Sequence, residues 1–165
     1  MAETVFVITH RRSGTHWTLD AVRHNFSLVS KNFIVLERIL RRHKQHLTLC
    51  QFQRRLDEEP GIVLVKTHTP PDLAPFRADK RTDRFIRDLL SESKVIYVYR
   101  DGRDVLVSLY FYMKHYDEAI QQTSFSDVKR RPVAGEPNRV QYWKSHVQGW
   151  LAQPRELISI AYEDL

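Results

Sequence analysis

The chain has 165 residues, of which 42% are hydrophobic and 28% are charged, so it can form one domain with an apolar core. Its 26 basic residues exceed its 20 acidic ones, and the scattered excess favours anionic ligands weakly, without singling out nucleic acid. Cys50 is the only cysteine, which excludes an intrachain disulfide. The sequence has no recognisable signal peptide or membrane-spanning run, so we predict a cytoplasmic protein without membrane or nucleic-acid partners.

Apolar runs and helical periodicity alternate along the chain. In chain order they predict a strand at 4–8, helices at 17–26, 39–47 and 52–56, a strand at 61–65, a helix at 85–90, a strand at 94–99, helices at 105–116 and 143–151, and a strand at 157–161. Each strand is an almost unbroken apolar run, which indicates burial on both faces. The alternation predicts a three-layer α/β fold in which helices flank a parallel sheet.

Residues 121–138 interrupt this alternation. The stretch is polar and is broken by Pro132, Gly135 and Pro137, so we predict a long mobile loop that could act as a lid. No internal repeat or low-complexity segment is visible, and we expect a single domain over residues 1–165.

Polar and basic segments follow each predicted strand. They read THRRSGTHW, KTHTPP, YRDGRDVLVS and YEDL in chain order. Ligands of open parallel sheets bind beyond the carboxyl ends of the strands, so these segments should converge on one crevice.

The first of these segments resembles a phosphate-binding turn in its physics. A strand that ends at Ser13 and Gly14 and opens into a helix presents free backbone N–H groups to an anion, with Arg12 supplying charge. The segment lacks the leading glycine and the Gly-Lys-Ser/Thr ending of an ATP-binding P-loop, and no magnesium ligand is evident. A single phosphate with a separate transferable group fits better than ATP hydrolysis.

The four segments together resemble the donor-binding signature of the cytosolic sulfotransferases. The family reads Tyr-Pro-Lys-Ser-Gly-Thr-Thr-Trp and Lys-Thr-His-Leu-Pro where this chain has residues 10–17 and 66–70. Arg100 and Ser108 have the family's eight-residue spacing, and the HVQGW and YED segments near the end of the chain also match. The resemblance covers almost the whole chain and implies the P-loop nucleotide-hydrolase-like sulfotransferase fold.

The resemblance also implies an activity. These enzymes transfer a sulfuryl group in line from 3′-phosphoadenosine 5′-phosphosulfate (PAPS) to a hydroxyl or amine of a small acceptor, releasing 3′-phosphoadenosine 5′-phosphate (PAP), with no metal. His68 would be the catalytic base, Lys66 would add positive charge, and Arg12 would act on the leaving oxygen. Arg100 and Ser108 would hold the 3′-phosphate, and Trp17 would stack on adenine, with Tyr162 nearby. The implied donor-binding residues are Arg11, Arg12, Ser13, Gly14, Thr15, His16, Trp17, Arg100, Ser108 and Tyr162.

This chain departs from the family pattern at three points. Arg12 stands where the family has a lysine. The arginine keeps the positive charge, but it hardly ever gives up a proton. His16 replaces a threonine that would bind phosphate. Family members also continue past the YED segment into a glycine-rich loop that grips the 3′-phosphate, so we expect a C-terminally incomplete domain, either a piece of a longer enzyme or a short relative.

Other interpretations remain open at this stage. Trp17 or Tyr162 could be core residues, Arg100 could simply pair with Asp104, and Ser108 could merely pack. The chain could instead be a P-loop kinase-like ATP enzyme or a non-catalytic nucleotide- or polyanion-binding module. The acceptor cannot be predicted, because an apolar acceptor and a core role explain the aromatic residues around 110–116 equally well. The sequence does not predict the oligomeric state either.

Overall fold

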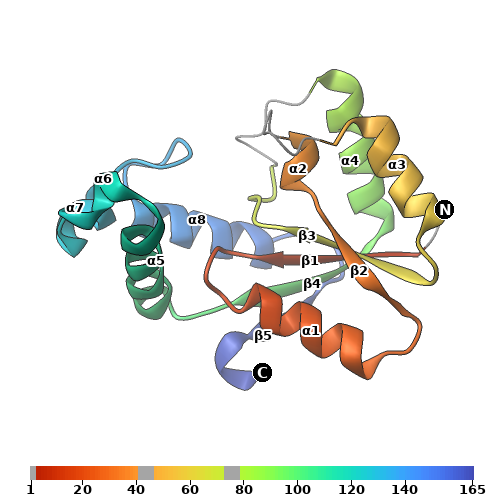
Figure 1. Cartoon of the computed structure of the whole chain (residues 1–165), viewed down its shortest axis with the longest axis horizontal. Helices are drawn as coiled ribbons and strands as arrows, with labels where there is room; N and C mark the ends of the chain where they lie inside the picture. The colour runs from red at the N-terminus through yellow and green to blue at the C-terminus, as the bar shows by residue number, and fades with distance from the viewer. Residues whose placement is uncertain (1–2, 41–46, 73–78) are drawn as a thin grey trace.

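A computed structural model describes residues 3–40, 47–72 and 79–165 of the chain (Figure 1). Its centre is a sheet of five parallel strands in the order β2-β3-β1-β4-β5. The strands are β1 (Thr4–Thr9), β2 (Val29–Val35), β3 (Ile62–Thr67), β4 (Lys94–Tyr99) and β5 (Ile158–Ala161). β1 lies in the middle, where Thr4 pairs with Val63 of β3 and Val5 with Lys94 of β4. The predicted parallel α/β architecture is therefore confirmed.

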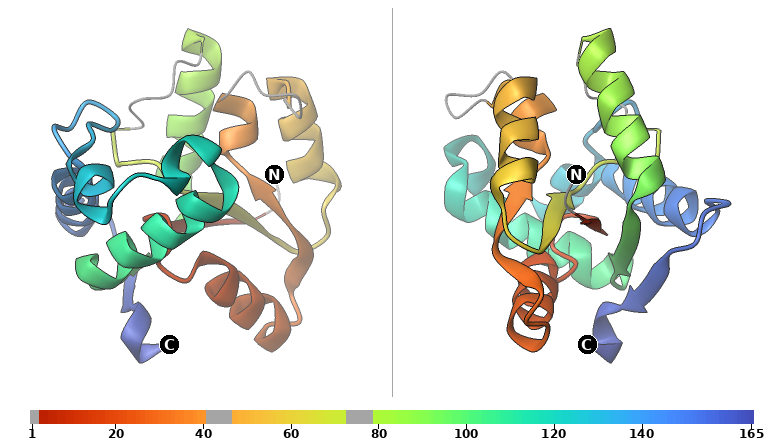
Figure 2. Two further views of the ribbon diagram at one scale, coloured as in Figure 1. Left: turned by 60° about the vertical axis from the view of Figure 1, so that its left-hand side comes forward. Right: turned by 90° about the vertical axis from the view of Figure 1, so that its right-hand side faces the viewer.

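Helices cover both faces of this sheet. The helices of the described ranges are α1 (Thr15–Asn25), α2 (Glu37–Leu40), α3 (Leu49–Glu58), α4 (Lys80–Glu92), α5 (Gly102–Tyr116), α6 (Glu118–Gln121), α7 (Phe125–Arg130) and α8 (Arg139–Leu151), followed by a 3₁₀ turn (Tyr162–Asp164). Figure 1 shows α5, α6 and α7 beyond one end of the sheet. Figures 1 and 2 show α3 and α4 on one face of the sheet and α1 on the other. The larger core cluster joins Phe6 to Phe52 and Ile86 on the first face, and the smaller one joins Val7 to Leu19 on the second.

Local signals in the sequence fix the ends of several helices. Thr48 and Gln51 form a capping box at the start of α3, which satisfies backbone N–H groups that have no partner within the helix. The Asp79 carboxylate accepts from the N–H groups of Arg81 and Thr82 at the start of α4, and Asn138 caps α8 through the N–H of Gln141. Polar caps therefore set where these helices begin.

The strand β2 was not predicted. Of the helix predicted at 39–47, Ile39 and Leu40 are helical in α2, and Leu47 is not. The polar residues Ser30, Lys31 and Asn32 interrupt the apolar run of β2, and its pairing with β3 shifts register between Val29 and Phe33. An irregular outer strand of this kind has no clean periodicity to detect. The helix α2 ends at Leu40, and residues 41–46 lie outside the described ranges.

The prediction that every strand is buried on both faces is wrong for β5. Within the described part of the chain β5 pairs with β4 alone, and Ile158 is 61% exposed. β1, β3 and β4 do carry the buried apolar residues expected of inner strands.

The prediction of a long loop over 121–138 is also wrong in its first half. The helix α7 forms there because the Ser124 side chain accepts from the N–H of Asp127 and because Val128 is buried. Only the second half is irregular, with a bridge between Val133 and Glu136 around a positive-φ glycine, Gly135. Among the helices of the described ranges, none has both the length and the apolar content that a membrane span requires.

Candidate active site

A cleft of about 990 Å³ lies where the carboxyl ends of the strands meet α5 and the start of α8. Every site residue predicted from the sequence lines it except Ser13, which is fully buried. The predicted residues that line it are Arg11, Arg12, Gly14, Thr15, His16, Trp17, Lys66, His68, Arg100, Ser108 and Tyr162. The prediction that the strand ends converge on one crevice is therefore confirmed.

The turn between β1 and α1 has an unusual backbone. Arg12 and Gly14 both have positive φ, at 70° and 84°. A positive φ is rare for a residue with a side chain, such as Arg12. Gly14 also packs directly against the Tyr162 ring, so that a methyl group in place of its hydrogen would overlap that ring. The Ser13 hydroxyl is buried and has no hydrogen-bond partner within the described part of the chain. The turn is thus tightly packed and contains a hydroxyl group without a hydrogen-bond partner.

His68 follows β3 and has a defined proton position. Its Nδ1 lies 2.9 Å from the Thr9 carbonyl oxygen and 3.1 Å from the Thr9 hydroxyl. A carbonyl can only accept, so Nδ1 carries the hydrogen and Nε2 of the neutral ring keeps a free lone pair. Burial, aided by the positive charge of Lys66, lowers the pKa of His68 to about 3, so the ring is neutral at physiological pH.

Glu37, which sequence reasoning missed, holds the loop that carries this histidine. One carboxylate oxygen, Oε1, accepts from the backbone N–H of His68 at 2.6 Å and from the Thr67 hydroxyl at 3.2 Å. Burial lowers the pKa of Lys66, and the charge of Glu37 opposes that shift. Glu37 lies just past the end of β2, so the strand-end rule would have found it if that strand had been recognised.

The helix α8 supports the same loop from the other side. The Trp150 Nε1 donates to the Thr69 carbonyl at 2.9 Å, and the Trp150 ring stacks on Tyr97. The Tyr97 hydroxyl lies 3.1 Å from Nδ1 of His146, whose ring meets that of His10 edge to face at 5.4 Å. Burial lowers the pKa values of His10 and His146 to about 4 and about 3. A packed aromatic cluster therefore lies behind the site.

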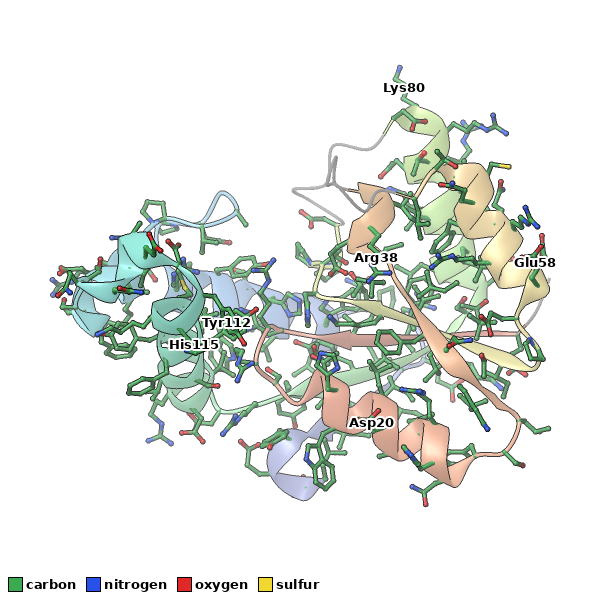
Figure 3. The ribbon with its side chains drawn as sticks, viewed as in Figure 1. Asp20, Arg38, Glu58, Lys80, Tyr112 and His115 are labelled. Atoms are coloured by element: carbon green, nitrogen blue, oxygen red, sulfur yellow. The ribbon has the colours of Figure 1, made fainter. Side chains whose placement is uncertain are left out.

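The basic residues on the α5 side already have partners in the protein. The Arg12 Nε donates to the Ser108 hydroxyl at 3.1 Å, and its guanidinium lies 5.0 Å from the centre of the Tyr112 ring. Figure 3 shows Tyr112 on α5. Arg100 lies over the Tyr162 ring at 4.5 Å and 3.6 Å from Asp104. The Arg100–Asp104 pair that the sequence left open is thus present, while both Arg100 and Ser108 still face the cleft.

Comparison with known proteins places this chain in a family. The sulfotransferase domain family matches residues 2–165. The chain belongs to the sulfotransferase family. It is 29% identical to sulfotransferase 2B1 of Mus musculus and 27% identical to sulfotransferase 1E1 of Homo sapiens, in each case over 99% of this chain but only 45% and 54% of the relative. The chain therefore spans about half the length of the curated relatives that it matches.

Solved structures agree on the fold. The mouse sulfotransferase SULT7A1 complexed with PAP superposes with a TM-score of 0.64 at 18% identity, covering 98% of this chain and 52% of that one. A retinol dehydratase in a complex with retinol and PAP gives a TM-score of 0.57 at 22% identity, covering 98% and 55%. The sulfotransferase fold predicted from the sequence is confirmed.

One alternative left open by the sequence is settled by exposure in this sulfotransferase family member. Trp17 is 64% exposed at the start of α1, so it is not a core residue, and its ring is free to contact a ligand in the cleft. Tyr162 lies between Gly14 and Arg100 at the same edge of the cleft. His16 is exposed, with its ring 6.4 Å from that of Phe33.

Proposed function

We propose that this chain carries the donor site and the catalytic residues of an enzyme that transfers a sulfuryl group from PAPS to a hydroxyl or amine of a small acceptor. The observation that carries the proposal is the orientation of His68. Its Nδ1–H is held by the Thr9 carbonyl, which leaves Nε2 as a proton acceptor on the wall of a cleft that also contains a phosphate-binding turn.

The β1–α1 turn binds the 5′-phosphate of the donor. Backbone N–H groups at the start of α1 face this position, and the helix dipole favours an anion there. Ser13 is buried beneath the turn, while the exposed Trp17 ring stacks on adenine. Arg100 and Ser108 hold the 3′-phosphate, for which the forked guanidinium is well shaped.

The negative charge of the bound donor favours the protonated ring and raises the pKa of His68 from its low value in the free chain. In the transfer step, His68 Nε2 takes the proton of the acceptor hydroxyl as its oxygen bonds to sulfur. The bond between sulfur and the phosphate oxygen breaks in line, and PAP leaves with the electron pair. Arg12 and Lys66 stabilise the negative charge that develops on the leaving oxygen, as in phosphoryl transfer. Arg12 acts by charge and hydrogen bonding alone, since its guanidinium does not give up a proton.

The test measures donor binding and transfer separately. Calorimetry with PAP and adenosine 5′-phosphate should show binding that weakens by about tenfold or more when the 3′-phosphate is absent. In a transfer assay with PAPS and para-cresol, His68→Ala should lower the rate by about a hundredfold or more while PAP still binds. His24→Ala, which removes an exposed histidine of α1, is the matched control and should keep the wild-type rate.

Two results would contradict the proposal. If PAP does not bind, the chain has no working donor site. If PAP binds and His68→Ala transfers sulfate at the wild-type rate, the histidine is not the base.

A further inference from the structure

The cleft contains two arginines that neither the proposed donor contacts nor the proposed transfer step uses, although the family resemblance implies a donor-binding role for Arg11. Arg11 lies beside the phosphate-binding turn, and Arg139 is the first residue of α8. The Arg139 guanidinium is partly enclosed, and its Nε is buried without a hydrogen-bond partner in the part of the chain that the structure describes. A buried donor without a partner costs free energy, which a suitable ligand would recover.

These two arginines line the same cleft. Burial lowers the pKa of Arg139 first, and the positive charges of Arg11 and Arg131 lower it further. Among ion pairs between described residues, none includes Arg11 or Arg139. Unpaired positive charges that line one cleft favour the binding of an anion there.

The lysine and arginines that line the cleft outnumber its two carboxylates, Glu37 and Asp117. Oε1 of Glu37 accepts from the N–H of His68, its Oε2 is buried without a hydrogen-bond partner in the described part of the chain, and its charge acts on Lys66, while Asp117 caps α6 by accepting from the N–H of Ala119 at 3.1 Å. The charge of Arg11 also acts on His68 and on Lys66, so this arginine lies on the side of the cleft that holds the catalytic base. The unneutralised positive charge therefore faces the acceptor's end of the cleft.

The rest of that end is aromatic and apolar. Tyr112 and Tyr116 project from α5 with ring centres 4.7 Å apart, and Met113, Val133 and Ala134 also line the wall. Such a wall packs against an aromatic ring or an alkyl chain.

We propose that the acceptor is a phenol or aromatic alcohol that also carries a carboxylate, which Arg11 and Arg139 bind while the ring lies against Tyr112 and Tyr116. The inference rests on the proposed function for the place of the hydroxyl at His68, but carboxylate binding requires no transfer. Two guanidinium groups can donate several charge-assisted hydrogen bonds to one carboxylate, and a neutral acceptor cannot replace them.

The test compares three phenols of similar size and different charge: para-hydroxyphenylacetate, its neutral amide, and the cationic amine tyramine. Their binding to the full chain, with PAP present, is measured by calorimetry. The acid should bind about tenfold or more tightly than the amide, and tyramine should bind most weakly. Equal binding of the acid and the amide to the unmodified chain would overturn the inference.

Variants then locate the preference. Arg139→Gln should reduce the preference for the acid over the amide to about twofold or less, and Arg139→Lys, which keeps the charge but loses the forked geometry, should give an intermediate value. Arg84→Gln removes an exposed arginine of α4 outside the cleft and should keep the full preference. A preference that survives Arg139→Gln, or a loss of PAP affinity in its place, would also overturn the inference.

A parallel transfer assay with PAPS separates this inference from the proposed function. If the acid is preferred in binding but none of the phenols is sulfated, the anion site stands and the proposed activity fails. If the amide and the acid bind and are sulfated equally, the activity stands and the anion site fails.

Discussion

At the scale of single residues, the site depends on groups that hold His68 as well as on His68 itself. Glu37 has this role, because one of its oxygens accepts from both the His68 N–H and the Thr67 hydroxyl. The replacement Glu37→Ala leaves that N–H without its acceptor, and we expect the free energy of unfolding to fall by about 1–3 kcal/mol. Glu37→Gln keeps an acceptor oxygen and should cost less.

The measurements for Glu37 are urea unfolding and transfer kinetics. For Glu37→Ala, kcat should fall while PAP affinity stays the same, because the histidine loop moves and the proposed phosphate-binding turn does not. If Glu37→Ala and Glu37→Gln were equally stable and equally active, the hydrogen bonds of Glu37 would not be what orients the loop.

The residues of the site could be predicted where a recognisable strand leads into them. Ser13, His68 and Arg100 follow β1, β3 and β4, whose apolar runs are clear in the sequence, and the order of such strand ends identifies the crevice. Glu37 could not be predicted, because the polar middle of β2 hides the strand before it. The hydrogen bond from Arg12 to Ser108 was not predicted, and the pairing of Arg100 with Asp104 was left open. Sequence spacing does not reveal which polar group a long side chain contacts.

At the scale of elements, the turn between β1 and α1 is shaped by its contact with the 3₁₀ turn at Tyr162. Gly14 and Gly135 both have positive φ, but a methyl group at Gly14 would overlap Tyr162, whereas nothing lies within 4 Å of the corresponding position at Gly135. Gly135→Ala should therefore lower the free energy of unfolding by about 1–2 kcal/mol, the cost of the left-handed backbone alone.

Gly14→Ala should cost clearly more than Gly135→Ala, and it should also weaken PAP binding, because Tyr162 and the turn must separate. Urea unfolding and PAP calorimetry on the two variants provide the comparison. Equal losses of stability with unchanged PAP affinity would mean that the contact between Gly14 and Tyr162 does not shape the site.

Elements were predictable from the sequence where their buried residues form a regular pattern. The inner strands are unbroken apolar runs, and α3 and α4 repeat their apolar residues at helical spacing because each buries one face, through Phe52 and Leu56 or through Ile86, Leu89 and Leu90. The helix α7 was missed because it depends on a single cap at Ser124 and one buried side chain, Val128, beside several loop-forming residues. Short capped helices carry too few buried positions to produce a periodic signal.

At the scale of the whole molecule, three enclosed histidines make stability depend on pH. The folded state holds the pKa values of His10, His68 and His146 at about 4, 3 and 3, whereas an unfolded chain has a value of about 6.5. Below pH 6.5 the unfolded state therefore binds more protons, so stability present above that pH is lost as the pH falls toward 4. We expect a loss on the order of 1 kcal/mol per histidine per pH unit in this window.

Urea unfolding at a series of pH values between 7.5 and 4.5 tests this expectation. His146→Gln should reduce the slope of stability against pH by roughly a third, while His24→Gln, an exposed site on α1, should leave the slope unchanged. A slope that does not respond to His146→Gln would assign the pH dependence to other groups.

The central position of β1 also has a consequence for the order of events during folding. Thr4 pairs with Val63 and Val5 pairs with Lys94, so the first strand of the chain must wait for two partners that are synthesised much later. Parallel pairings between distant segments form slowly, since the intervening chain must be ordered first. A nascent chain therefore contains the anion-binding motif long before it contains an anion-binding site. Under the proposed function, affinity for PAP should appear only after β1 has paired with both β3 and β4.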